Sequence, residues 1–327
     1  MDWSKKRVLV TGAGGFIGSH LTERLVAAGA NVTAFVRYNA LGTWGWLEES
    51  PAAEHAEVVA GDITDRDSVR KAMKGVDIVL HLAALIAIPY SYEAPGSYVQ
   101  TNTLGTLNVL QCARDQNVER MVHTSTSEVY GSARYVPIDE EHPLQGQSPY
   151  SASKIGADKM AEAFHLSFAL PVVTLRPFNT FGPRQSARAV IPTIVSQCLA
   201  GKTVRLGSLH PTRDMNFVAN TVEGYLLAAA APDAVGRTIN LGSGSEISIG
   251  DLAGLIIDLT GRSVTVETED RRVRPSGSEV DRLLASATVA HTLLGWKPAV
   301  DLEEGLRHTI SWIADNMGRY RPGIYTV

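Results

Sequence analysis

The chain has 327 residues, 44% of them hydrophobic and 20% charged, so it is long enough to bury a full core. Its formal net charge of -4 provides no general basic field, and we expect neither nucleic acid nor a membrane surface as a partner. The segment 1–6 is short and polar and lacks the apolar core of a signal peptide. No apolar run reaches the length of a transmembrane helix, about 18 residues. These features predict a cytoplasmic location. Cys112 and Cys198 show no disulfide or metal-binding spacing, and we expect both to be buried.

Short runs rich in Val, Ile and Leu alternate with amphipathic stretches through the first half of the chain. We expect strands at residues 7–11, 31–36, 57–60, 77–82, 120–125 and 171–176, and helices at 16–28, 68–73, 98–115 and 150–168. Strands that lack a period of two and are separated by helices indicate a parallel sheet covered on both faces. The pattern therefore predicts an α/β fold of the Rossmann type, with a doubly wound parallel sheet.

The regular alternation ends after residue 176, where prolines interrupt shorter elements at Pro177, Pro183, Pro192 and Pro211. We therefore expect residues 1–176 to form the Rossmann domain and residues 177–327 to form mainly a smaller C-terminal lobe. One more buried strand is expected at residues 238–241. This strand predicts that part of the second lobe returns to the first domain.

A glycine-rich turn joins the first expected strand to the first expected helix. Gly12, Gly15 and Gly18 are three residues apart, and Phe16 and Ile17 begin the helix. The spacing departs from G-x-G-x-x-G, but the order of strand, glycine turn and helix is the one in which backbone amides hold a pyrophosphate. The loop therefore predicts a bound dinucleotide.

The ends of the second and third strands bear on which nicotinamide dinucleotide binds. Arg37 stands where an acidic residue would accept hydrogen bonds from ribose hydroxyls, and this favours NADP over NAD. A solvent-facing arginine at a strand end is the alternative. Asp62 and Ile63 are placed to contact the adenine, although a turn-capping aspartate explains Asp62 almost as well.

Tyr150 and Lys154 lie one turn apart at the start of an expected helix, on the same face. A phenol with a pKa of about 10 is a poor base at neutral pH, but an adjacent ammonium stabilises its phenolate. The strand that ends at Ser125 is followed by Thr126 and Ser127, whose hydroxyls are placed to hold a substrate oxygen beside the tyrosine.

Together these motifs resemble the extended short-chain dehydrogenase/reductase superfamily over essentially the whole chain. The resemblance includes His81-Leu82-Ala83-Ala84, Asn102-Thr103-Leu104-Gly105-Thr106 and Arg176-Pro177-Phe178-Asn179-Thr180-Phe181-Gly182-Pro183-Arg184. It implies that Tyr150 is the catalytic base with Lys154 and that Thr126 holds the carbonyl oxygen. It also implies that Leu82, Ala83 and Ala84 line the cofactor site.

The stretch Ser125-Thr126-Ser127-Glu128-Val129-Tyr130-Gly131 resembles the active-site strand of nucleotide-sugar 4,6-dehydratases. GDP-mannose 4,6-dehydratases carry Thr-Ser-Glu there, whereas dTDP-glucose dehydratases carry Thr-Asp-Glu, so Ser127 departs from the second branch. Simple 4-epimerases lack the glutamate, but UDP-glucuronate decarboxylases share Thr-Ser-Glu. The resemblance implies a dehydratase acting on a nucleotide-linked hexose or N-acetylhexosamine, in which Glu128 removes the C5 proton and the cofactor is recycled. A decarboxylase, an epimerase and a non-catalytic dinucleotide sensor are the alternatives.

Two further stretches resemble dehydratases that act on nucleotide-linked N-acetylglucosamine in legionaminic-acid-type pathways. They are Phe35-Val36-Arg37-Tyr38-Asn39 with Trp44-Gly45-Trp46-Leu47-Glu48, and Leu85-Ile86-Ala87-Ile88-Pro89-Tyr90-Ser91-Tyr92. A hydrophobic lid without a chemical role is the alternative for the two tryptophans.

A sugar nucleotide carries a diphosphate, which guanidinium groups bind in a fork that lysine cannot reproduce. The resemblance implies that Arg213 and Arg274 contact the diphosphate and that Asn179 lies near it. Arg184 and Arg188 are further candidates, and an ion pair between lobes is the alternative for each arginine. Glu279 follows Arg274-Pro275 at a longer spacing than in GDP-mannose dehydratases, where the equivalent glutamate binds the nucleotide ribose.

The nine histidines show no metal-ligand spacing, and we expect no metal. The resemblance also implies a homodimer, in which the helices at residues 98–115 and 150–168 form a four-helix interface.

Overall fold

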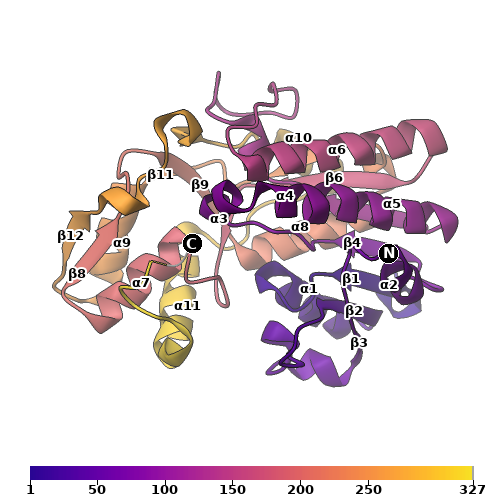
Figure 1. The fold of residues 1–327 in the computed structure, drawn as a ribbon, viewed down its shortest axis with the longest axis horizontal. Coiled ribbons are helices and arrows are strands. Elements are labelled where there is room, and N and C mark those ends of the chain that lie inside the picture. The colour runs from indigo at the N-terminus through magenta and orange to yellow at the C-terminus, as the bar shows by residue number, and fades with distance from the viewer. Residues whose placement is uncertain (326–327) are drawn as a thin grey trace.

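The computed structural model describes residues 1–325 and has a seven-stranded parallel sheet at its centre, in the order β10-β6-β5-β4-β1-β2-β3 (Figure 1). The strands are β1 (Arg7–Thr11), β2 (Asn31–Arg37), β3 (Ala56–Gly61), β4 (Ile78–His81), β5 (Arg120–Thr124), β6 (Val172–Pro177) and β10 (Thr238–Leu241). The strands β1, β2 and β3 extend the sheet in one direction, and β4, β5 and β6 extend it in the other, so the strand order switches between β1 and β4. Ligands of such folds bind at this switch point. The predicted Rossmann fold is confirmed.

Helices cover both faces of this sheet. One face carries α1 (Phe16–Ala27) and α8 (Val218–Ala230), and the other carries α2 (Arg66–Ala72), α5 (Gly105–Asp115) and α6 (Pro149–Phe168). The residues of β1 show why the strands lack a period of two: Val8 and Val10 pack into one core, and Leu9 packs into the other. Successive side chains of a strand point to opposite faces, so a sheet covered on both faces buries neighbouring residues alike.

The helix predicted at residues 98–115 is instead divided. The short helices α3 (Ile88–Glu93) and α4 (Pro95–Tyr98) precede a π-helical segment, Val99–Leu104, and α5 follows it. In the π segment the side chain of Asn102 accepts a hydrogen bond from the backbone N of Leu85 at 2.8 Å and donates one to the Leu85 carbonyl at 2.9 Å. The widened turn accompanies this side-chain clamp, and such bulges are frequent at functional sites.

The smaller lobe lies beside the carboxyl ends of the sheet, to the left in Figure 1. One sheet contains β7 (Asn179–Phe181), β9 (Thr212–Phe217), β11 (Glu246–Ser248) and β13 (Arg282–Leu283), and β8 (Thr203–Leu206) pairs with β12 (Thr265–Thr268). Its helices are α7 (Val190–Ala200), α9 (Ile249–Thr260) and α11 (Leu302–Asp315), whereas α10 (Thr288–Leu294) packs near β10. Because β10 joins the central sheet, the chain passes from the first domain to the lobe and back.

Both cysteines are buried and free, as expected. Over residues 1–325, no helix combines the length and the apolar character needed to cross a membrane.

Candidate active site

A cleft of about 1330 Å³ opens where the sheet strands end and the smaller lobe faces them. Every residue proposed for the site from the sequence lines this cleft. They are Gly12, Gly15, Phe16, Ile17, Gly18, Arg37, Asp62, Ile63, Leu82, Ala83, Ala84, Ser125, Thr126, Ser127, Glu128, Tyr150, Lys154, Asn179, Arg188, Arg213, Arg274 and Glu279. The cleft is thus built from the ends of the six strands β1 to β6 and from the second lobe.

The glycine loop forms a turn whose close contacts exclude side chains. Gly12 has a φ of +74°, and a Cβ on Gly18 would lie 2.2 Å from the Gly12 carbonyl oxygen. The first helix begins at Phe16 with Gly15 as its N-cap, so no side chain competes for the amide groups of its first turn. This arrangement fits a dinucleotide pyrophosphate, which the positive end of α1 would stabilise.

The two tryptophans after β2 cover the glycine loop. The backbone N of Trp46 donates to the Gly14 carbonyl at 3.0 Å, and a Cβ on Gly14 would lie 2.4 Å from the carbonyl oxygen of Trp44. Both indoles line the cleft. Gly14 therefore matters for contact with this cover, a role that its place in the motif did not indicate.

The structure places both residues that bear on cofactor choice at the edge of the cleft. Arg37 is exposed at the end of β2. Asp62 accepts hydrogen bonds at 2.8 Å from the backbone N and from the hydroxyl of Thr64, so it caps a turn while lining the cleft. Both of these hydrogen bonds are those of a turn-capping aspartate.

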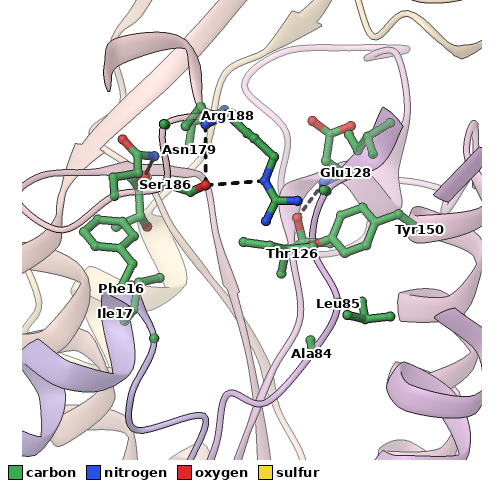
Figure 2. Close-up of a pocket in the computed structure, with 18 of the residues that line it drawn as sticks. Phe16, Ile17, Ala84, Leu85, Thr126, Glu128, Tyr150, Asn179, Ser186 and Arg188 are labelled. Carbon is green, nitrogen blue, oxygen red and sulfur yellow. Dashed lines mark hydrogen bonds between the residues drawn. The ribbon is translucent and has the colours of Figure 1, made fainter. Parts of the chain in front are cut away.

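The first residues of α6 bring Tyr150 and Lys154 to the end of β5. Ser148 caps this helix through a reciprocal capping box with Ser151, which fixes where the helix starts. The Lys154 ammonium donates a 2.5 Å hydrogen bond to the Thr124 carbonyl oxygen. Figure 2 shows the Tyr150 ring beside Thr126, facing the cavity.

Burial shifts the pKa values of this pair in opposite directions. Burial raises the pKa of Tyr150, and a hydrogen bond with Thr126 opposes the rise only in part. Burial also lowers the pKa of Lys154 to about 8, against the charge of Asp158. The role of the Lys154 ammonium in making Tyr150 a base stays a prediction, and the cost of burying a phenolate is what the ammonium has to offset.

The turn after β5 presents Glu128 to the same cavity. Thr126 is the N-cap of a short 3-10 helix, Ser127–Tyr130, and its hydroxyl accepts a hydrogen bond from the Glu128 backbone N at 3.2 Å (Figure 2). Ser127 is buried beside them. The hydroxyl of Ser125, in contrast, donates to Asp158 at 2.7 Å, so it is engaged behind the cleft.

Arginines from the second lobe converge on one carboxylate. Arg213 and Arg274 lie 3.4 Å and 3.7 Å from the same Glu279 oxygen. Burial lowers the pKa of Arg213, and the negative charge of Glu128 opposes this effect. The pair offers a fork of positive charge that suits a diphosphate.

The remaining polar residues differ in what they contact. Figure 2 shows Arg188 reaching into the cavity between Phe16 and Tyr150, with its Nε 3.4 Å from the Ser186 hydroxyl. The side-chain Nδ2 of Asn179 is buried and has no hydrogen-bond partner among the described residues. Arg184 forms an ion pair with Glu23 at 2.7 Å, and this pair joins the two lobes, as the alternative for the arginines predicted.

Some lining residues carried no sequence signal. Apolar side chains from the second lobe line the far part of the cleft, and Arg272 places its guanidinium 4.8 Å from the ring of Tyr325 there. The apolar members are Val190, Leu206, Met215 and Ile249. In the sequence they follow the ordinary pattern of core positions. No cluster of His, Cys, Asp and Glu suited to a metal ion occurs within the described part of the chain.

A Rossmann sheet, a glycine loop at its switch point and a Tyr-Lys pair facing it define a nicotinamide-dependent enzyme of the extended short-chain dehydrogenase/reductase class. The family model of GDP-mannose 4,6 dehydratase matches residues 9–309. The chain belongs to this family.

Known relatives include two kinds of nucleotide-sugar enzyme. A dTDP-glucose 4,6-dehydratase of Streptomyces antibioticus is 34% identical over 96% of this chain and 94% of its own length. A putative UDP-glucose 4-epimerase of Methanocaldococcus jannaschii is 30% identical over 94% and 99%. The structure of the dTDP-glucose 4,6-dehydratase DesIV from Streptomyces venezuelae, solved with NAD bound, superposes with a TM-score of 0.89, at 32% identity over 96% of this chain and 98% of that one.

Proposed function

We propose that the protein is a nucleotide-sugar 4,6-dehydratase. The observation that carries this proposal is the position of Glu128, whose carboxylate shares the cavity with the Tyr150, Thr126 and Lys154 group. A redox site needs only the tyrosine and its neighbours. A second acid/base residue in the same cavity serves a second proton transfer, which elimination of water requires.

In this proposal each residue has one task. Thr126 holds the C4 oxygen and Tyr150 accepts the C4 hydroxyl proton. A bound nicotinamide would supply the hydride acceptor for C4 and the hydride donor for C6. Glu128 removes the C5 proton, which is acidic beside a C4 ketone, and the C6 hydroxyl leaves beside Ser127 as water with the proton that Glu128 has taken up. When hydride reaches C6, C5 takes a proton from solvent, which balances the proton that Tyr150 releases to solvent. Residues of the glycine loop, Gly12 to Gly18, hold the pyrophosphate of the cofactor.

The substrate is held by its nucleotide diphosphate. Arg213 and Arg274 bind the phosphate oxygens, with Arg188 and Asn179 on the side of the glycine loop. Glu279, now between the two arginines, binds the nucleotide ribose. We propose the division of labour expected from the sequence, with cofactor and catalysis in residues 1–176 and the sugar nucleotide mainly in residues 177–327.

An epimerase is the second candidate, favoured by the 30% identity to the Methanocaldococcus jannaschii protein. Incubating the purified protein with UDP-, GDP-, dTDP- and CDP-linked sugars and weighing the products separates the candidates. Loss of water supports the dehydratase, loss of carbon dioxide supports a decarboxylase, and a product of unchanged mass supports an epimerase. No turnover of any sugar in the presence of NAD or NADP would favour a dinucleotide sensor.

We also propose that the protein is a cytoplasmic homodimer. The helices expected to form the interface expose apolar side chains: Val99 and Leu104 are 51% and 49% exposed, and Leu166 and Phe168 are 76% and 50% exposed. A second copy related by a twofold axis would cover both faces at once. Light scattering at micromolar concentration tests this assembly, and a monomer would contradict it.

A further inference from the structure

A buried carboxylate outside the cleft, that of Asp158, lies one turn after Lys154 on α6. Asp158 is 4% exposed and does not line the cleft. It accepts hydrogen bonds from Ser125 Oγ at 2.7 Å and His123 Nε2 at 3.0 Å, and from Arg176 Nε and Nη2 at 3.3 Å and 3.1 Å. A charged group is buried in this way only when it is paired and hydrogen-bonded.

The protonation states in this network follow from its contacts. Burial raises the pKa of Asp158, but the hydrogen bond from His123 and the charge of Arg176 together lower it to about 2. The carboxylate is therefore anionic and only accepts hydrogen bonds, so the proton of neutral His123 lies on Nε2. Arg176 continues the network, because its Nη1 donates to the Tyr130 hydroxyl at 2.9 Å.

Three successive residues at the end of β5 are thus tied to α6. Asp158 holds the side chains of His123 and Ser125, and Lys154 holds the carbonyl of Thr124 between them. The next residue is Thr126, whose side chain lies beside Tyr150 (Figure 2) and opposes the rise in the Tyr150 pKa. The position of Thr126 against Tyr150 therefore depends on this attachment.

We propose that Asp158 is a positioning residue, which fixes the end of β5 against α6 and so keeps Thr126 and Lys154 in place beside Tyr150. The proposal rests on the proposed redox role of these three residues, which dehydration and epimerisation share. Asp158 acts through them, since its carboxylate is fully engaged behind the cleft. Small displacements of a catalytic group, of about 1 Å, cost on the order of 10²-fold in rate.

The charge of Asp158 also acts on Lys154. The groups that act on this ammonium are Asp158 on its own helix, the Thr124 carbonyl and His123 on β5, and His81 on β4. Burial lowers the pKa of both histidines, so neither adds a positive charge at neutral pH. Asp158→Asn removes the charge that keeps the Lys154 pKa from falling further, and the lysine should lose its proton at lower pH.

Three variants test the proposal: Asp158→Asn, Ser125→Ala and the control Glu162→Gln, which makes the same charge change at an exposed position of α6. We expect Asp158→Asn to slow the reduction of the nicotinamide cofactor by about 10²-fold, with a smaller change in KM. The substrate in this assay is the nucleotide sugar that the parent turns over. The Lys154 signal of protein labelled with ¹³C at the lysine ε-carbon, assigned with Lys154→Met, should titrate at lower pH. Ser125→Ala should slow NAD reduction without moving the Lys154 titration, and Glu162→Gln should change neither.

A folded Asp158→Asn protein, judged by circular dichroism and Tm, that keeps the parent rate and the parent Lys154 titration would overturn the proposal. If Asp158→Asn does not fold, parent-like NAD reduction by Ser125→Ala would overturn it instead. If the parent protein reduces neither NAD nor NADP with any sugar of the panel, the proposed function alone is overturned. The Lys154 titration needs no substrate and would still decide the role of Asp158.

Discussion

The indole of Trp46 packs edge-on against that of Trp312, with 5.3 Å between ring centroids and 77° between the ring planes. Trp46 follows β2 in the Rossmann domain, whereas Trp312 belongs to α11 near the end of the chain. The guanidinium of Arg319 lies 4.8 Å from the centroid of the Trp46 ring and pairs with Glu49. The segment that covers the glycine loop is therefore attached to the C-terminal part of the second lobe.

This attachment predicts that Trp46→Ala weakens cofactor binding. An aromatic pair contributes about 0.5–1.5 kcal/mol, so its loss should raise the Kd of the dinucleotide by about 2–10-fold. Trp46→Phe keeps a ring against Trp312 and should fall between the parent and the alanine variant. Calorimetric titration with NAD and with NADP measures the Kd for each variant and for the parent. An alanine variant with the parent Kd would show that the cover does not contribute to binding.

The position of Arg37 predicts the cofactor preference. It is exposed at the end of β2 and lines the cleft, where a guanidinium can meet a 2′-phosphate. Arg37→Asp should shift preference toward NAD, because it replaces a phosphate partner with an acceptor for the ribose hydroxyls. Comparing the two Kd values before and after the change tests this. If the parent binds NAD and NADP with equal Kd values and Arg37→Asp leaves both unchanged, Arg37 does not contact the cofactor.

The burial of Lys154 predicts a loss of activity in alkali. Its pKa is lowered to about 8, so the ammonium is present below that pH and disappears as pH rises through it. The uncharged amine no longer stabilises the phenolate of Tyr150, and kcat/KM should fall along a single basic limb near this value. A pH profile of kcat/KM measures the limb. Constant kcat/KM up to the ordinary pKa of lysine would contradict the assignment.

The parts of the site that the sequence revealed are those whose residues are close along the chain. The glycine loop and the pair Tyr150 and Lys154 are local patterns on a strand-turn-helix and on one helix face. The role of Asp158 is not local, since an aspartate on a helix ordinarily faces solvent and its burial depends on His123 and Arg176 from two strands. The π segment around Asn102 likewise coincides with hydrogen bonds to Leu85, which lies beside it only in the folded protein.

Tertiary contacts also produce features of the site that spacing along the chain does not show. The effect of Lys154 on Tyr150 could be inferred from their spacing, but the cost of burying the phenol depends on everything packed around it. The contact of Trp46 with Trp312 joins segments at opposite ends of the chain. Spacing along a sequence contains no information about either.

The final prediction concerns Glu128, because it separates dehydration from simple redox chemistry at the same site. Glu128→Gln keeps the size of the side chain and the backbone hydrogen bond to Thr126 but removes the base. Turnover to a 6-deoxy-4-keto product should fall by roughly 10²–10⁴-fold. Oxidation at C4 depends on Tyr150 and Lys154 and should survive, so the variant should accumulate reduced cofactor, seen by absorbance.

Two comparisons make this result specific to the C5 proton. Tyr150→Phe should form no reduced cofactor, since it lacks the group that accepts the C4 hydroxyl proton, whereas Glu128→Gln should form it and then stop. In deuterated water the parent should exchange deuterium into C5, and the Glu128 variant should not. A Glu128→Gln enzyme that exchanges C5 at the parent rate would rule out this residue as the base. That outcome would assign the C5 proton to another base, whereas a parent enzyme that does not exchange C5 at all would favour decarboxylation, in which no proton needs to leave C5.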